Sequence, residues 1–92
     1  MASFDETTVI GLRLMDQADG SLVTRSQGRR LMVGLENFRD IVLDFDNVAS
    51  IGQGFTDEVF RVWRNAHSSI SLRAINANSE VSAMLRQVGH AS

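Results

Sequence analysis

The chain contains no cysteine, no proline and no lysine. Without cysteine it can form no disulfide framework, thiol nucleophile or thiolate metal site. The absence of proline is consistent with short connections between regular elements. Because lysine is absent, all nine basic residues are arginine, and the net charge is only -2. This balance argues against a protein held on nucleic acid by phosphate contacts, which needs a basic patch.

Long apolar runs are also missing. No stretch approaches the roughly 20 residues that a membrane helix needs. The N-terminal MASFDETT carries acids where a signal peptide has a basic and then an apolar run. We therefore expect a cytoplasmic protein with no membrane partner. The 92 residues predict a single domain, residues 1–92, with one modest core.

Hydrophobic periodicity predicts three strands. Ile10, Leu12 and Leu14 alternate with other residues, which is typical of a half-buried strand. Residues 41–43 are consecutive apolar residues, which favours a strand covered on both faces. The predicted strands span residues 7–15, 40–45 and 70–75, and residues 21–23 are either a short strand or an extended lead-in.

The first and last predicted helices have clear start signals. Thr24 and Gln27 have capping-box spacing, and the apolar stripe that follows comprises Leu31, Leu35 and Phe38. Gly28 weakens this helix, and we leave two readings open: close approach to a neighbouring strand, or a tolerated weak spot. Asn78 is a good N-cap for a last amphipathic helix that runs to about Gly89, with apolar residues Val81, Met84, Leu85 and Val88.

The middle helix is predicted from Gly52 to Ala66. Phe60 and Trp63 widen its apolar face beyond what one sheet usually needs. Helices alternate with strands along the chain, which predicts an α/β layer arrangement. The core stripe of this helix is expected to be Phe55, Val59, Val62 and Ala66.

The stretch SIGQGF, residues 50–55, joins the central strand to this helix. It lacks both the G-x-G-x-x-G spacing of a dinucleotide fingerprint and the Lys-Ser/Thr of a P-loop. Ser50 and Gln53 form a second capping-box pattern. We expect Gly52 to let the turn close and Gly54 to let the start of the helix pack tightly. A recognition role for the same turn stays open beside this structural one.

Few residues are candidates for chemistry. His67 and His90 have no partner at metal-ligand spacing, so no metal site, catalytic residue or cofactor is expected. Asp44 and Asp46 follow the central strand, where open α/β sheets place their ligands. They are either a metal or acid–base pair or, as we favour, residues that cap and turn the loop.

The arginines form a more informative set. Five of them fall on the first two predicted helices, near Phe60 and Trp63, and arginine is favoured at protein interfaces because its planar fork pairs with carboxylates and stacks on aromatics. A protein-binding face and a solvated charged face are the two readings of this pattern. The five are Arg25, Arg29, Arg30, Arg61 and Arg64.

VLDFDNVASIGQGFTDEVFRVW, followed by INANSEVSAML, resembles the STAS-like family of unknown function. TRSQGRRLMVGL resembles that family's S-R-S-x-A-x-R-L-L helix, with Thr24 and Gly28 as departures. More remotely the chain is similar to STAS anti-sigma factor antagonists. The resemblance covers residues 9–88 and implies a small layered α/β domain, with a mixed sheet of three or four strands and about three helices.

The resemblance also implies how the protein works. The antagonists bind a histidine-kinase-like ATPase, which phosphorylates a serine in a D-S-S-G motif. That motif falls on residues 52–55 of this chain, where no residue can be phosphorylated. The expected function is therefore a non-enzymatic regulatory module that binds a protein partner without the usual switch. The expected partner-binding residues are Gln53, Gly54, Phe55, Asp57, Glu58, Arg61 and Trp63, with Asp44, Ser50 and Gly52 forming the structural turn.

Two rival functions stay open at this point. One is a small-ligand or nucleotide sensor that uses Asp44 and the loop from Gly52 to Gly54. The other is a structural homo-oligomer, for example a homodimer, in which Phe60 and Trp63 are buried between identical subunits.

Overall fold

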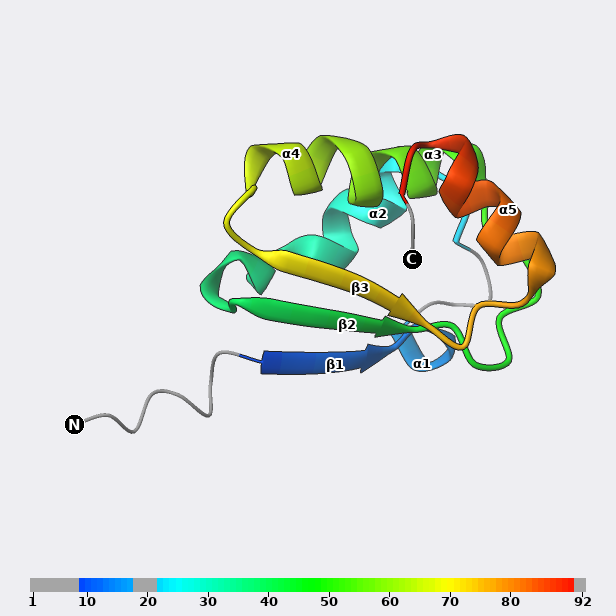
Figure 1. The fold of residues 1–92 in the computed structure, drawn as a ribbon, viewed down its shortest axis with the longest axis horizontal. Coiled ribbons are helices and arrows are strands. Elements are labelled where there is room, and N and C mark those ends of the chain that lie inside the picture. Colours follow the sequence, from blue (N-terminus) through cyan, green and yellow to red (C-terminus); the bar gives the residue numbers. More distant parts are fainter. Residues whose placement is uncertain (1–8, 18–21, 91–92) are drawn as a thin grey trace.

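The computed structural model describes residues 9–17 and 22–90 (Figure 1). A sheet and several short helices confirm the α/β class. Residues 7, 8 and 21, which belong to predicted strands, lie outside the described residues, and Leu22 and Val23 form no strand. In chain order the elements are β1 (Val9–Arg13), α1 (Leu14–Gln17), α2 (Arg25–Met32), η2 (Leu35–Asn37), β2 (Asp40–Asp44), α3 (Gln53–Asp57), η3 (Glu58–Trp63), α4 (Arg64–Ala66), β3 (Ser71–Ile75) and α5 (Ser79–Gln87).

The described strands form one sheet in the order β1-β2-β3, and both neighbouring pairs are parallel. The sheet is therefore parallel and not mixed as we predicted. Crossovers between parallel strands are right-handed in nearly all proteins. Because the strand order follows the chain order, both crossovers lie over the same face. Figure 1 shows the result: α2, the helix from α3 to α4, and α5 all lie on one side of the sheet.

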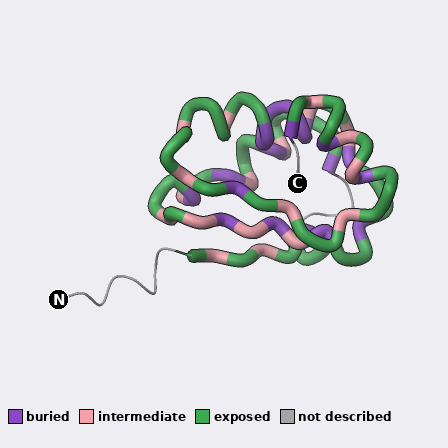
Figure 2. The backbone as a smooth tube through the Cα atoms, viewed as in Figure 1, coloured by how far each residue is buried: buried purple, intermediate pink, exposed green. Residues whose placement is uncertain are grey.

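Burial along β2 shows that, in the part of the chain that the structure describes, only this one face is packed. Ile41 and Leu43 are fully buried, whereas Asp40, Val42 and Asp44 are partly exposed. Figure 2 shows the same alternation along the strands. Our prediction that this strand is covered on both faces was therefore wrong. The three apolar residues are consecutive because Val42 is a β-former on the open face, and not because that face is packed.

Helix α2 starts as its sequence predicts. The Thr24 hydroxyl accepts a hydrogen bond from the Gln27 amide, and Gln27 Oε1 accepts one from the Thr24 amide at 2.8 Å. The helix ends earlier than predicted, at Met32, because Gly34 takes a left-handed conformation with φ of 84°. Leu35 is still buried, but it reaches the core from the separate turn η2.

Gly28 marks a close contact, as one of our two interpretations held, although the neighbour is a helix and not a strand. A Cβ atom at this position would lie 3.1 Å from the carbonyl oxygen of Phe55 and 3.2 Å from Glu58 Cβ. The backbones of α2 and α3 can approach this closely only because residue 28 has no side chain. The two helices therefore form one packed layer above the sheet.

The middle helix runs continuously from Gln53 to Ala66, but its central part, η3, is a π-helix. A π-helical turn is wider than an α-helical one, because its hydrogen bonds join residues five apart. The side chains that follow η3 are therefore rotated about the helix axis relative to those that precede it. An apolar pattern with 3.6 residues per turn does not reveal this change.

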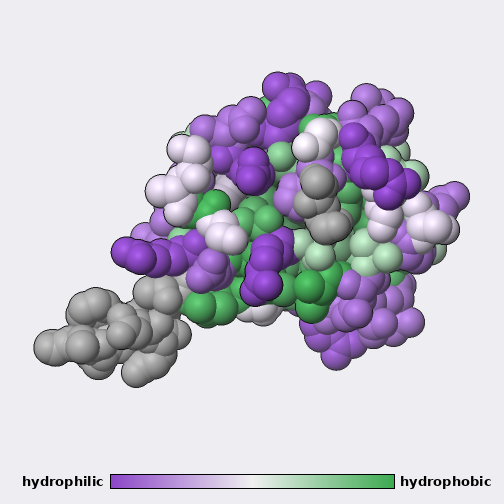
Figure 3. Space-filling view, in the orientation of Figure 1, coloured by the Kyte–Doolittle hydropathy of each residue, from purple (hydrophilic) through white to green (hydrophobic). Residues whose placement is uncertain are grey.

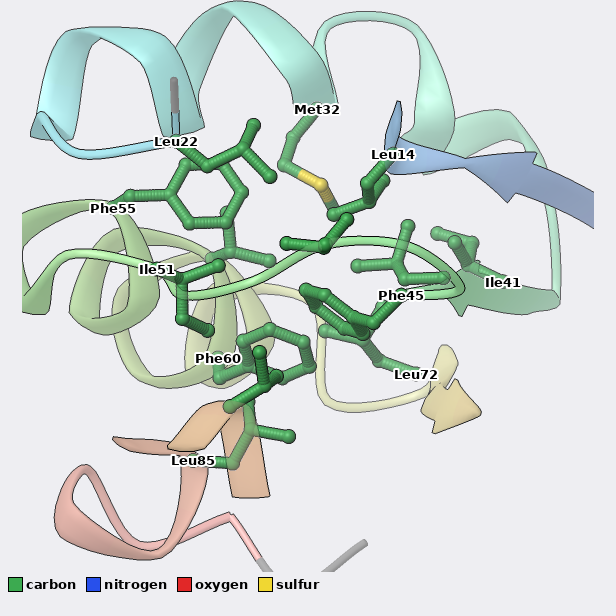
Figure 4. Packing of buried hydrophobic residues seen from close by; sticks show 14 of the residues in the cluster. Leu14, Leu22, Met32, Ile41, Phe45, Ile51, Phe55, Phe60, Leu72 and Leu85 are labelled. Atoms are coloured by element: carbon green, nitrogen blue, oxygen red, sulfur yellow. The ribbon is translucent and has the colours of Figure 1, made fainter. Parts of the chain in front are cut away.

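The rotation changes which side chains reach the core. Phe60 is only 3% exposed, whereas Val62, which we predicted to be in the core, is 38% exposed and Ala66 is also exposed. In Figure 4 the Phe60 ring lies between Phe45 and Leu85. The wide apolar face of this helix is thus largely used inside the molecule.

The C-terminal helix closes the core beside Phe60. Asn78 is the predicted N-cap of α5, since its side chain accepts a hydrogen bond from the Val81 amide at 2.8 Å. Gly89, with φ of 90°, ends the helix and lets His90 fold back onto the Phe60 ring, 4.6 Å between centroids. Burial, and to a lesser extent the charge of Arg64, lower the pKa of His90. No local pattern around His90 indicates that this histidine is buried.

Candidate functional site

The turn that precedes α3 is held by the backbone of the segment before α2. The Gly52 amide donates to the Leu22 carbonyl at 2.8 Å, and the Phe55 amide donates to the Val23 carbonyl at 3.0 Å. Two of the amides that a phosphate group would need are therefore already paired within the chain. This arrangement does not favour the ligand-sensor hypothesis for the loop.

The two glycines of the turn are explained by this contact. A Cβ atom at Gly52 would lie 2.7 Å from the carbonyl oxygen and 2.8 Å from the Cα of Val23. At Gly54 the nearest atoms, the Arg25 amide nitrogen and the Val23 carbonyl oxygen, would both be 3.3 Å away. A side chain at position 52 would collide with backbone atoms, so glycine is required there.

The predicted capping box of Ser50 and Gln53 was wrong. The N-cap of α3 is Gly52, and no side chain caps it. Ser50 is exposed outside the helix. Instead, the fully buried Thr56 hydroxyl donates to the Gly52 carbonyl at 2.6 Å. The backbone contacts with residues 22 and 23 take over the role that we had given to the capping side chains.

Three of the residues expected to bind a partner are buried. Phe55 is fully buried in the core beside Leu22 (Figure 4), so it holds the turn in place and cannot contact a partner in this conformation. Asp57 and Glu58 are each 9% exposed. Their side chains point toward α2, where they meet arginines. Of the predicted surface, Gln53 and Arg61 remain exposed, while Gly54 and Trp63 are partly buried.

Asp57 and Glu58 lie beneath three arginines from two helices. Arg25 Nη1 is 2.7 Å from Asp57 Oδ2, and Arg61 holds both oxygens of the same carboxylate, through Nε and, at 2.9 Å, through Nη2. Arg25 Nη1 and Arg29 Nη1 are each 3.6 Å from Glu58 Oε1. Asp57 and Arg61 are four residues apart on one helix, a spacing that favours an ion pair, whereas no local pattern reveals the contacts between the two helices.

These contacts set the charge state of Asp57. The hydrogen bonds from Arg61 first, and then from Arg25, lower the pKa of the Asp57 carboxyl to about 2. The same carboxylate raises the pKa of Arg61. The group therefore stays fully ionised at all physiological pH values and ties α2 to α3.

We expect Asp57→Asn to destabilise the protein in a pH-dependent way. An unfolded aspartate titrates near pH 3.9, roughly, so a folded pKa of about 2 means that the ionised form stabilises the fold above about pH 4. That contribution is lost as the pH falls through about 2. The difference in unfolding free energy between wild type and variant, measured by urea titration, should be constant above about pH 5 and shrink below it. A difference independent of pH would contradict this assignment.

Asp44 and Asp46 do not form a carboxylate pair. Asp44 Oδ1 accepts hydrogen bonds from the Asn76 side chain at 2.9 Å and from the Asp46 amide at 3.0 Å. These two bonds lower the pKa of Asp44, with the larger effect from Asn76. Asp44 thus joins the ends of β2 and β3, which is the turn role that we favoured from the sequence.

Trp63 and His67 form a small unit at the far end of the same helix. Their rings stack with centroids 4.1 Å apart, and the His67 ring nitrogen Nδ1 lies 2.9 Å from the Trp63 carbonyl oxygen. Trp63 also packs against the edge of the core. An open cavity of about 630 Å³ lies next to this unit, at the N-terminal ends of β2 and β3. It is lined by Glu36, Asn37, Phe38, Arg39, Ala66, His67, Ser68, Ser69 and Ile70.

Residues 27–82 match a family model described as a STAS-like domain of unknown function. No curated protein and no solved structure is significantly similar to the chain. Among residues 9–17 and 22–90, no helix is long and apolar enough to cross a membrane, and no three acidic, histidine or cysteine side chains are grouped so that they could hold a metal ion.

Proposed function

Because this chain belongs to the family of STAS-like domains of unknown function, we propose that it is a non-enzymatic regulatory module that binds a protein partner. The partner class that we propose is a histidine-kinase-like ATPase, which is the partner implied by the resemblance to anti-sigma factor antagonists. This step rests on family analogy. The surface that we propose for binding is supported by the charge and exposure of the side chains around Asp57 and Glu58.

The arginine cluster over Asp57 and Glu58 is the observation that carries the proposal. The two carboxylate side chains are 13% and 11% exposed, whereas those of Arg25, Arg29 and Arg61 are 48%, 62% and 53% exposed. The negative charges therefore lie beneath the surface and the positive charges lie on it. A surface with this order of charges complements an acidic partner, although the chain as a whole is slightly negative.

The buried carboxylates also restrain the arginines. A guanidinium that is already held by a carboxylate loses less conformational entropy when a partner binds, and its remaining N–H groups stay free for further hydrogen bonds. Gln53 and the exposed side chain of Val23 lie beside this cluster, because the backbones of the two segments are hydrogen-bonded to each other. We define the docking face as Val23, Arg25, Arg29, Gln53 and Arg61.

The docking face replaces part of the surface that the sequence predicted. Gln53 and Arg61 are retained, Trp63 is left out because it is partly buried and stacks on His67, and Phe55 is withdrawn because it is in the core. In Figure 3, hydrophilic side chains dominate the helical part of the molecule, and hydrophobic ones gather lower, over the strands. Binding through the helices is therefore expected to depend on charge and to weaken as salt is added.

We further propose that binding is not switched by phosphorylation of this turn. The motif position of the antagonists corresponds to residues 52–55, which carry no hydroxyl group. The next hydroxyl, that of Thr56, is fully buried and donates to the Gly52 carbonyl. Ser50 is exposed but lies outside the motif position.

The triple variant Val23→Ser, Arg29→Gln, Gln53→Ala tests the docking face. These side chains are exposed or make only long ion pairs, so the variant should fold. We expect wild type to capture a histidine-kinase-like ATPase from native lysate, and the purified pair to bind at least about tenfold more tightly than the triple variant, roughly 1.4 kcal/mol, by titration calorimetry.

Arg86→Gln is the matched control, because Arg86 is an exposed arginine on α5, away from the docking face. It should bind as wild type does. Equal affinity of wild type and the triple variant would remove the docking face, and a captured partner of another class would remove the proposed ATPase.

A further inference from the structure

The described residues leave one face of the sheet open, which is unusual for a parallel sheet. Such sheets occur almost only where both faces are covered, whereas here the described helices that cover the sheet all lie on one side. Apolar side chains are nevertheless present on the open face, with Val9 53% and Ile75 40% exposed. This combination indicates that another surface covers the open face.

The strand register fixes the pattern of side chains on the open face. Side chains that point away from the helices come from every second residue of each strand. They form three rows across the sheet, which we call the outer grid: Val9, Asp40 and Ser71; Gly11, Val42 and Arg73; Arg13, Asp44 and Ile75.

The apolar residues of the outer grid lie along one diagonal. Val9 is at one corner, Val42 is at the centre and Ile75 is at the opposite corner. Two arginines and two aspartates lie beside this line, so the face has no net charge. On one side of the diagonal are Gly11, Arg13 and Asp44, and on the other are Asp40, Ser71 and Arg73.

This pattern is complementary to itself. If two copies of the outer grid face each other across a two-fold axis along the diagonal, Val42 meets Val42 and Ile75 meets Ile75. The same rotation places Arg73 opposite Asp44 of the other copy, twice in the dimer. A two-fold axis along either the strands or the rows would instead place aspartate opposite aspartate at the positions of Asp40 and Asp44.

We propose that the outer grid binds the outer grid of a second copy of this chain. With about 4.8 Å between strands and about 6.6 Å between alternate residues, the diagonal lies about 36° from the strands. The strands of the two copies then cross at about 70°, closer to the orthogonal than to the aligned packing of two sheets. Two-fold dimers of this kind are the commonest oligomers.

The dimer is expected to be weak. Three five-residue strands cover an area of roughly 15 by 17 Å, well below the roughly 800 Å² per partner of a standard interface. A dissociation constant between about 10 μM and 1 mM is therefore expected. The docking face shares no residue with the outer grid, so the dimer and the proposed partner complex do not compete for residues.

Val42→Arg tests the proposal, because it would place two arginines against each other on the two-fold axis. In the monomer the new arginine lies between Asp40 and Asp44, so the fold should tolerate it. Analytical ultracentrifugation from about 10 μM to about 1 mM should show a monomer–dimer equilibrium for wild type and monomer only for Val42→Arg. The control is Val33→Arg, an exposed valine outside the sheet, which should dimerise as wild type does.

Ser71→Glu provides the opposite test. Ser71 faces Arg13 of the other copy in the proposed dimer, so a glutamate there should tighten dimerisation by about three- to tenfold. The proposal is overturned if wild type stays monomeric at about 1 mM. It is also overturned if Val42→Arg dimerises as wild type does, or if Ser71→Glu fails to tighten the dimer. None of these outcomes bears on the docking face, which shares no residue with the outer grid.

Discussion

Replacing Phe60 by alanine should cost about 3–5 kcal/mol of unfolding free energy. Its ring is almost fully buried and is packed against Phe45, with centroids 6.3 Å apart, and against His90. A domain of this size is stable by only about 5–14 kcal/mol, so the variant should be close to unfolding. Urea titration monitored by circular dichroism measures the difference.

Val62→Ala is the matched control for Phe60→Ala. A regular α-helix would place Val62 in the core beside Phe55 and Val59, whereas the π-helical turn leaves it 38% exposed. We therefore expect Val62→Ala to change stability by no more than about 0.5–1 kcal/mol. A larger loss for Val62→Ala than for Phe60→Ala would mean that the helix is α-helical throughout.

The burial of Phe60 also determines which residues can be mutated to test binding. From the sequence alone, Phe60 and Trp63 were the natural residues to bury between identical subunits or against a partner. Because Phe60 is internal, weaker binding by Phe60→Ala would report the destabilised fold and not a lost contact with the partner. Probes of the docking face must therefore be chosen among exposed residues such as Val23, Arg29 and Gln53.

Gly52→Ala is expected to destabilise the protein by about 3 kcal/mol or more. The new Cβ atom would lie 2.7 Å and 2.8 Å from backbone atoms of Val23, so the clash cannot be relieved by rotating a side chain. Relief requires the two segments to separate, which would break the hydrogen bonds from Gly52 to Leu22 and from Phe55 to Val23. Thermal and urea unfolding should both show the loss.

Gly11→Ala is the control for this second prediction. Gly11 lies in β1, and a Cβ atom there would meet no atom within 4 Å. Alanine at this position should be neutral or should stabilise the protein by about 0.5–1 kcal/mol, because it restricts the unfolded chain. If both glycine variants behave alike, the close approach at Gly52 is not what destabilises the first of them.

The sequence by itself determined the three strands, the three longer helical segments and their order, but not the short elements α1 and η2. Alternation in β1, the Thr24 capping box and the Asn78 N-cap depend on residues within a few positions of each other, so local patterns are sufficient to find them. The motif runs were also sufficient for the family, which residues 27–82 match. The unusual glycine content of the SIGQGF turn correctly indicated a tight backbone contact.

Only the tertiary structure decided which side chains are exposed and can contact a partner. Phe60 is buried and Val62 is exposed because η3 has a different number of residues per turn, which no local pattern reveals. The carboxylate of Asp57 binds Arg25, which is 32 residues away in the sequence, because α2 and α3 pack closely at Gly28. The sheet kept one face open because both crossovers have the same hand and the strand order follows the chain. Docking surfaces depend on such distant contacts, and so they could be located only once the helices and strands were placed together.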